Sequence, residues 1–148
     1  MTGTVKAQTT IDGSIELTIT VTPTEAAVLG SDADTLTDYI DTALWALVML
    51  RSGATGDGTA PSAADLAIVV QHMDTRLLPR IEGIRDAAIR AYAELPDASH
   101  GRLARAMDVA RSTAQDRRAA LVAREPSGWE EWAREGGPIG RPNPDSGA

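Results

Sequence analysis

The sequence of 148 residues contains no cysteine, no phenylalanine, one lysine and two histidines. Without cysteine, the chain cannot form disulfides, thiolate zinc sites or a thiol nucleophile. Because it has only three tryptophans and two tyrosines, its core must be mainly aliphatic. The longest apolar run, residues 43–50, is much shorter than the ~20 residues that span a bilayer, and no signal-peptide pattern opens the chain. We therefore expect a cytoplasmic protein that does not bind a membrane.

Side chains suited to catalysis or metal binding are scarce. His72 and His100 fall on different predicted segments, and neither has a partner at a metal-ligand spacing. The glycine-rich segment 52–62 lacks the Gly-Lys-Ser/Thr ending of a phosphate-binding loop. We expect no enzyme activity, no cofactor or metal and no small-molecule ligand.

The net charge of −7 is unevenly distributed along the chain. Residues 1–60 carry two basic and eight acidic side chains, a net charge of −6, and residues 61–98 and 125–148 are also net acidic. Residues 99–124 carry six arginines against two aspartates, a net charge of +4. A basic segment on an acidic chain is compatible with specific DNA binding. Alternatively, these arginines pair with acidic residues within the protein or across a dimer.

The N-terminal residues alternate between apolar and polar side chains with a period of two, which predicts a β-hairpin over residues 5–21. A three-residue loop, Ile11-Asp12-Gly13, would pair Thr9 with Ile15 and put glycine at the left-handed position. A two-residue loop would instead put the two apolar rows on opposite faces, so we favour the longer loop. Because an isolated hairpin is marginally stable, its apolar face must lie on helices or on a second chain.

Two helical segments follow the hairpin. Thr22 and Glu25 form a capping-box pattern that opens a short helix ending at Gly30, and residues 31–34 cap a second helix that runs to about Arg51. The second helix has an unusually broad apolar surface, which indicates a central core helix or a subunit interface, with the core favoured. That surface comprises Leu36, Tyr39, Ile40, Ala43, Leu44, Trp45, Leu47, Val48 and Leu50.

A long helical segment is predicted from Ser62 to Leu95. One apolar stripe keeps its phase throughout, although Pro79 should kink or break the helix. The constant phase favours a kinked continuous helix over two separate helices. Such a helix suits a dimer contact and the spine of a monomer equally well. The predicted stripe comprises Leu66, Val70, Met73, Leu77, Ile81, Ile84, Ala88, Tyr92 and Leu95.

Residues 103–121 (LARAMDVARSTAQDRRAAL) have the pattern of a helix, a three-residue turn and a second helix. The predicted packing positions are Leu103, Ala104, Met107, Val109, Ala114 and Leu121. Over about 20 residues, 102–121, the stretch resembles bacterial helix-turn-helix DNA-binding domains. The resemblance lies in Leu103-Ala104, in Val109 of the turn, and in Arg111-Ser112-Thr113-Ala114, which opens the second helix.

Three positions depart from the family pattern. Asp108 replaces the usual left-handed glycine, a conformation that aspartate tolerates better than most residues. Arg117 stands where an aliphatic residue usually packs the second helix. Ala110 occupies the N-cap position, so that helix lacks a capping side chain.

The resemblance implies roles for the polar residues of this segment. Arg111, Ser112 and Gln115 would contact bases in the major groove, where arginine pairs with guanine and glutamine with adenine. Other side chains would hold phosphates and fix the register without recognising sequence. These predicted phosphate contacts are His100, Arg102, Arg105, Thr113, Arg117 and Arg118.

After this segment, Ser127 and Glu130 form a capping-box pattern that opens a short helix through Arg134. Trp129 and Trp132 share one face of that helix, so it must dock on another surface. We expect it to dock under the helix-turn-helix and to supply the packing that Arg117 cannot; the alternative is an anchor for a partner protein.

Together, these features predict a mainly α (α+β) protein with an N-terminal β-hairpin packed on helices, a long kinked helix and a C-terminal helix-turn-helix closed by a tryptophan-bearing helix. The predicted parts are an acidic N-terminal region (1–60), a linking helix (61–98), a DNA-binding domain (99–136) and a disordered tail (137–148). We expect a homodimer that binds double-stranded DNA as a bacterial transcriptional regulator or mobile-element control protein. The alternative is a protein-interaction module, an adaptor or neutralising partner, that does not bind DNA.

Overall fold

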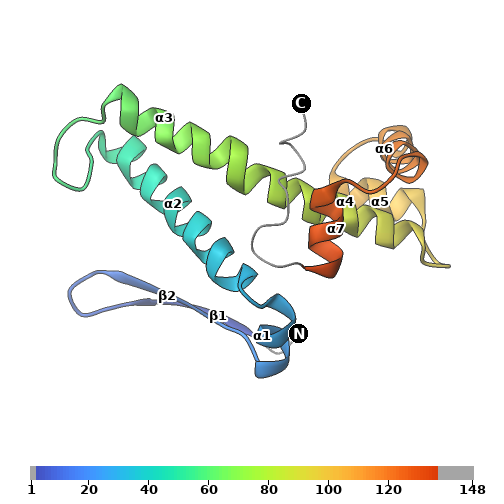
Figure 1. Cartoon of the computed structure of the whole chain (residues 1–148), viewed down its shortest axis with the longest axis horizontal. Helices are drawn as coiled ribbons and strands as arrows, with labels where there is room; N and C mark the ends of the chain where they lie inside the picture. The colour runs from blue at the N-terminus through green and yellow to red at the C-terminus, as the bar shows by residue number, and fades with distance from the viewer. Residues whose placement is uncertain (1–2, 137–148) are drawn as a thin grey trace. The chain divides into compact units, whose positions relative to one another are not determined.

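A computed structural model describes residues 3–136 of the chain, so the predicted tail (137–148) lies outside the described residues. The fold is mainly helical with one two-stranded antiparallel sheet, as the sequence predicted (Figure 1). The chain divides into two compact units, residues 1–38 and residues 39–148. None of the described helices is long and apolar enough to cross a membrane.

The first unit contains a β-hairpin of strands β1 (Thr4–Thr9) and β2 (Ile15–Thr20). Thr9 is paired with Ile15, which is the predicted register. Gly13 has φ +85°, as a three-residue loop requires, so the predicted loop is also confirmed. Every residue of both strands is exposed. The apolar row of the hairpin is therefore not covered within the first unit.

Helix α1 (Pro23–Leu29) follows the hairpin in the first unit, which ends within the next helix. It opens with the predicted capping box, in which the Glu25 N–H donates to Thr22 Oγ1 and the Thr22 N–H donates to the Glu25 carboxylate. It ends at Gly30, which has φ +54°. An apolar groove of about 590 Å³ lies between α1 and the hairpin, lined in part by Val5, Ile19, Val21, Val28 and Leu29.

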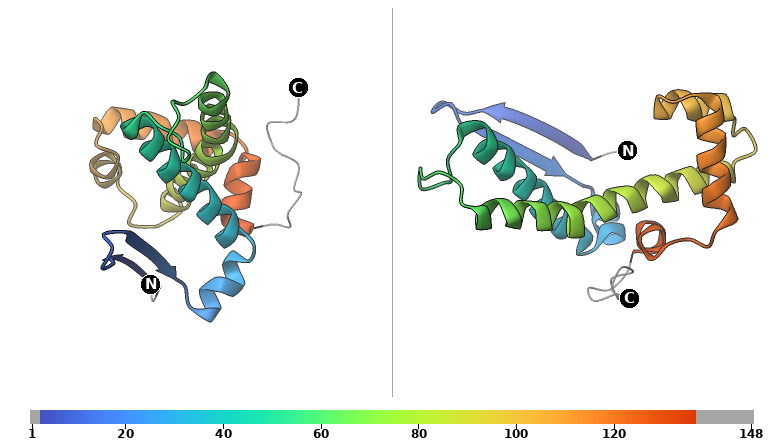
Figure 2. Two further views of the ribbon diagram at one scale, coloured as in Figure 1. Left: turned by 90° about the vertical axis from the view of Figure 1, so that its left-hand side faces the viewer. Right: turned by 90° about the horizontal axis from the view of Figure 1, so that it is seen from above.

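The second unit begins within helix α2 (Asp32–Ser52), which leads through a loop into α3 (Ala63–His72). A π-helical turn, η1 (Met73–Leu77), joins α3 to α4 (Leu78–Ala93), and the three form one long helical segment (Figure 2). In η1, the Leu78 N–H donates to the Met73 carbonyl, five residues back. The wider turn accommodates the following Pro79, which cannot donate a helical hydrogen bond. The helix is therefore continuous through the proline, as the sequence predicted.

The long helix and two shorter helices enclose an apolar core cluster. Helix α5 (His100–Met107) and helix α6 (Arg111–Ala123) pack on each other, and α6 packs on the C-terminal half of α4. All six predicted packing positions of residues 103–121 are in or against this cluster. It comprises Leu103, Ala104, Ala114 and Leu121 with Ile89 of α4, and Tyr92, Met107 and Val109 at its margin.

Helix α7 (Gly128–Glu135) opens with the predicted capping box and packs along α4. Its Trp129 lies against Gly83, while Trp129 and Trp132 both flank the Arg80 guanidinium at 4.8 and 5.7 Å from their ring centroids. The prediction that this helix docks under α5 and α6 is therefore wrong. The sequence signal for the correct site was Gly83, because only a residue without a side chain allows so close a helix contact.

The predicted apolar stripes of α2, α3 and α4 are largely exposed, although for α2 the sequence favoured a buried core. In α2 the buried residues are Ala46 and Met49, neither of which was in the predicted surface. Several of the largest predicted side chains are 40% or more exposed: Ile40, Leu44, Leu47, Val48, Leu66, Val70, Ile81 and Ile84.

Candidate nucleic-acid interface

The candidate interface is built on α5, α6 and the turn between them. Helix α5 is capped at its start by Ser99, whose hydroxyl accepts from the Arg102 N–H. Tyr92 of α4 holds this start in place, because its hydroxyl donates to the Ser99 carbonyl and accepts from the Ser99 N–H. The sequence placed Tyr92 only on an apolar stripe and did not predict this polar contact.

Asp108 ends α5 in the left-handed conformation, with φ 52° and ψ 47°. Its N–H donates to the Arg105 carbonyl, and the Val109 N–H donates to the Ala104 carbonyl. These bonds form a Schellman motif, which turns the chain and brings Val109 against the core. Asp108 is the only non-glycine residue with positive φ among residues 3–136, so the predicted role of this position is confirmed.

Helix α6 begins at Arg111 after Ala110, which gives no side-chain cap, as predicted. Its first backbone N–H groups are therefore not capped by a side chain, and the N-terminal end of a helix favours anions such as phosphate. The three residues predicted to contact bases, Arg111, Ser112 and Gln115, are all exposed in the first two turns. No side-chain hydrogen bond or ion pair engages Arg111 among the described residues.

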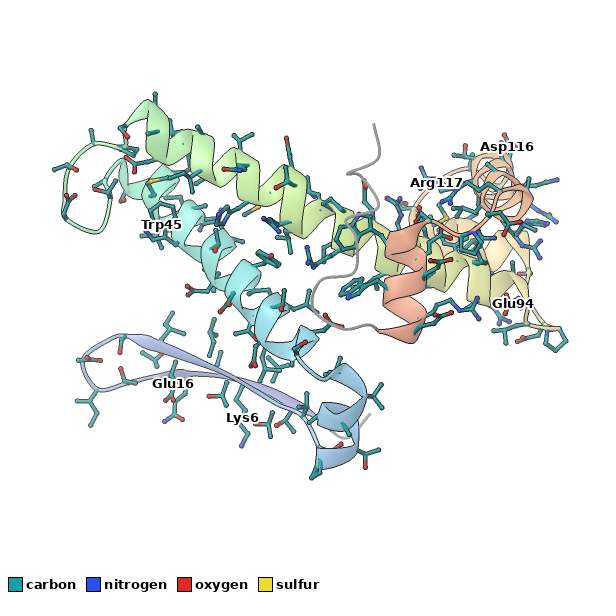
Figure 3. The ribbon with its side chains drawn as sticks, viewed as in Figure 1. Lys6, Glu16, Trp45, Glu94, Asp116 and Arg117 are labelled. Atoms are coloured by element: carbon teal, nitrogen blue, oxygen red, sulfur yellow. The ribbon has the colours of Figure 1, made fainter. Side chains whose placement is uncertain are left out.

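The predicted phosphate-binding residues lie in two different settings. Thr113 and Arg117 are exposed on α6, and Figure 3 shows Arg117 beside Asp116. Arg102 and Arg105 are exposed on α5, where Arg102 forms a solvent-exposed ion pair with Asp97 at 3.3 Å. These four side chains remain accessible to a ligand.

Arg118 and His100 are half-buried and contact each other. Arg118 Nη1 lies 3.2 Å from His100 Nε2, and Arg118 Nη2 donates to the Ala93 carbonyl at 3.1 Å. Because a guanidinium can only donate, His100 Nε2 is the acceptor here. The pair thus links α6 to α5 and to the end of α4, so part of its hydrogen-bonding capacity is already used.

One flank of α6 borders a cavity of about 400 Å³ next to α4. Its lining residues are Arg90, Ala93, Glu94, His100, Gln115, Arg118, Ala119 and Val122. Three nitrogens of these residues, Arg90 Nη2, His100 Nδ1 and Arg118 Nε, have no hydrogen-bond partner but are shielded from solvent. A molecule in the cavity would not reach them in this conformation. Gln115 stands at this border, whereas Ser112 does not line the cavity.

Asp116, labelled in Figure 3, is exposed on α6. It lies one helical turn after Ser112 and therefore shares the same face of the helix. The sequence identified this carboxylate only as one of the two acidic charges of residues 99–124. At this position it is as accessible as the predicted base-contacting residues. A carboxylate repels phosphate, but it can accept a hydrogen bond from the amino group of cytosine.

Arg124, just after α6, takes part in a partly buried ion-pair network with acidic residues of α4 and α7. Its guanidinium lies 2.6 Å from Glu130 and 3.6 Å from Asp86, and Arg90 also binds Glu130 at 3.0 Å. Glu130 is fully buried. Burial raises the pKa of Glu130, but hydrogen bonds from the Ser127 N–H, Arg90 and Arg124 outweigh this and hold the pKa at about 2.

Among residues 3–136, no group of three or more histidine, aspartate or glutamate side chains is arranged to hold a metal ion. No protein-family model matches the chain, and no curated protein or solved structure matches it either. The arrangement of α4, α5 and α6 is therefore the basis for a functional assignment.

Proposed function

We propose that the protein binds double-stranded DNA sequence-specifically through α5 and α6, as a homodimeric transcriptional regulator or mobile-element control protein of a bacterial cytoplasm. The observation that carries this proposal is the pairing of α5 and α6 through the left-handed Asp108, which leaves the start of α6 exposed. A helix held in this way can enter the major groove with its first residues at the base edges. No catalytic step is part of the proposed function.

In this proposal Arg111, Ser112 and Gln115 contact bases, and Asp116 joins them as a fourth candidate on the same exposed helix. Thr113 and Arg117 on α6 and Arg102 and Arg105 on α5 contact phosphates. Arg118 and His100 hold α6 against α4 and α5. Because His100 Nδ1 and Arg118 Nε are shielded, the pair offers phosphate only the remaining N–H groups at Nη1 and Nη2 of Arg118. The role of this pair is therefore mainly to position the helix that enters the groove.

The arginines of residues 99–124 support the proposal unequally. Arg111, Arg117, Arg102 and Arg105 are exposed, and the one ion pair among them, to Asp97, is open to solvent and therefore worth little energy. Arg124 instead pairs with acidic residues of α4 and α7. Four arginines of α5 and α6 thus remain accessible, and exposed positive charge favours contact with a polyanion.

The second candidate is a protein-interaction module without DNA binding. It is favoured by one specific observation, the large number of exposed aliphatic side chains outside α5 and α6. Such surfaces are typical of contacts with protein. The two candidate functions differ in what they require of α6, because only DNA binding needs its exposed arginines.

Selection of genomic fragments by the purified chain at two salt concentrations separates the candidates. DNA binding predicts enrichment of one sequence, arranged as two half-sites about one helical turn apart or a multiple of that distance, and a steep loss of affinity as salt rises. A matched variant, Arg111→Ala with Arg117→Ala, should lose the enrichment. Absence of any enriched sequence at low salt would refute the proposal.

A further inference from the structure

Helix α2 is apolar on two opposite sides, and only one side is used within the chain. Ala46 and Met49 are buried, whereas Ile40, Leu44, Leu47 and Val48 are between 42% and 64% exposed. The exposed residues recur at i, i+4, i+7 and i+8, so they form one continuous stripe. A helix that is apolar all round is normally buried on all sides.

The long segment of α3 and α4 has the same property. One face of α4 packs on α7 through Gly83, while Ile81 and Ile84 lie on another face and are 51% and 42% exposed. In α3, Leu66 and Val70 share one side and are 40% and 58% exposed. The second unit thus presents two helical arms, each with an apolar stripe that the rest of this unit does not cover.

We propose that these two stripes are the interface of a homodimer, in which α2 and the α3–α4 segment of two copies form a four-helix bundle. A helix in a two-helix hairpin buries a single stripe, but in a four-helix bundle each helix packs on two neighbours. In the dimer, the exposed apolar stripe of α2 and the exposed apolar stripe of α3–α4 supply these additional helix contacts. In a dimer with twofold symmetry, α2 of each copy packs on α3–α4 of the other, so both stripes are covered at once.

The exposed area fits a stable dimer. The eight side chains of the two stripes are on average about half exposed, which amounts to roughly 700 Å² per chain before the residues around them are counted. A stable interface buries about 800 Å² of each partner. The stripes contain no charged residue at their central positions, which is typical of the centre of a homodimer interface.

This interface is relevant to the proposed function, because Ile89 and Tyr92 of α4 belong to the apolar core that α4 shares with α5 and α6. A bundle that fixes the two copies of α4 would also fix the separation of the two α6 helices. The dimer itself does not depend on DNA binding, so it can be tested without DNA.

Sedimentation equilibrium of the full chain without DNA, at micromolar concentrations, tests the proposal. The wild type should have twice the chain mass of 15.6 kDa. Val48→Asp and Ile84→Asp should each raise the dissociation constant by more than about tenfold, because a carboxylate would be buried without a partner. The matched control is Val28→Asp on α1, where valine is 80% exposed and lies outside the stripes; this variant should remain dimeric.

Three results would overturn the inference: a monomeric wild type, a dimer that neither Val48→Asp nor Ile84→Asp weakens, or a dimer that Val28→Asp alone dissociates. The last would place the interface at the groove between α1 and the hairpin. Circular dichroism of each variant shows whether it has folded, and the wild-type mass decides the question if a variant has not. A monomer that still enriches one DNA sequence would refute the dimer and leave DNA binding intact.

Discussion

Gly83 of α4 and Trp129 of α7 are in direct contact, with no space between them for a side chain. A Cβ atom at position 83 would lie 2.7 Å from both Trp129 Cβ and the Trp129 carbonyl oxygen. Because that oxygen belongs to the backbone, it cannot move without displacing α7. This contact explains how a short helix with two tryptophans is held on the long helix.

Gly83→Ala should therefore lower the free energy of unfolding by about 1–3 kcal/mol, the usual cost of overpacking a close contact. Gly101→Ala is the matched control, since Gly101 also lies in a helix but has no atom within 4 Å of the added methyl group. There alanine should stabilise by about 0.5–1 kcal/mol through its higher helix propensity. Urea denaturation measures both; equal effects of the two substitutions would contradict the close contact.

The buried carboxylate of Glu130 gives a second prediction. Glu130→Gln keeps the capping pattern of α7 but removes the charge that pairs with Arg90 and Arg124, and should destabilise by about 3 kcal/mol. Solvent screens the ion pair with Arg124, which is 43% exposed, so that pair contributes the smaller part of this loss in stability. Glu131→Gln, one residue along on the exposed side of α7, should have little effect.

The difference between wild type and Glu130→Gln should also depend on pH. The pKa of Glu130 is lowered from 4.5 to about 2, so its carboxylate stabilises the fold fully above pH 4.5. This contribution is lost as the pH falls from 4.5 towards 2, where the wild-type side chain also becomes neutral. Unfolding free energies measured across this range should converge; a constant difference would show that the charge of Glu130 does not contribute.

Local features of the fold could be predicted from the sequence where one residue type decides the backbone. Gly13 fixed the hairpin loop, the Thr22 and Ser127 capping boxes fixed the starts of α1 and α7, and Asp108 fixed the turn after α5. In each case the signal lies within about four residues, so no knowledge of packing is needed.

Packing between distant elements was harder to predict. The sequence showed that Trp129 and Trp132 must dock, but two apolar surfaces were available, and only the close approach at Gly83 distinguishes them. Similarly, a charge count cannot separate Arg124, which pairs with Glu130, from the exposed Arg117. Apolar periodicity identified the stripes of α2 and α4, but a stripe has the same pattern whether its own chain or another one covers it.

The left-handed Asp108 gives a third prediction. Asp108→Val should destabilise by about 1–2 kcal/mol, because a β-branched side chain is poorly tolerated at positive φ. Asp108→Gly removes that strain and should be neutral or slightly stabilising. Thermal unfolding measures both. A smaller loss for valine than for glycine would show that the turn does not require this conformation in solution.

The exposed arginines of α6 give the last prediction, which rests on the proposed function. Arg111→Ala should weaken binding to the selected DNA site by about 1–3 kcal/mol and relax the preference at one base pair, as expected for a lost bidentate contact. Arg117→Ala should instead weaken binding to all sequences alike and reduce the slope of affinity against salt by about one phosphate contact. Fluorescence titration on the selected site and on a scrambled one, at several salt concentrations, separates these effects. If Arg111→Ala loses affinity equally for both DNAs, Arg111 contacts phosphate and the base-contacting role passes to the remaining exposed residues, with Asp116→Asn as the next variant to compare.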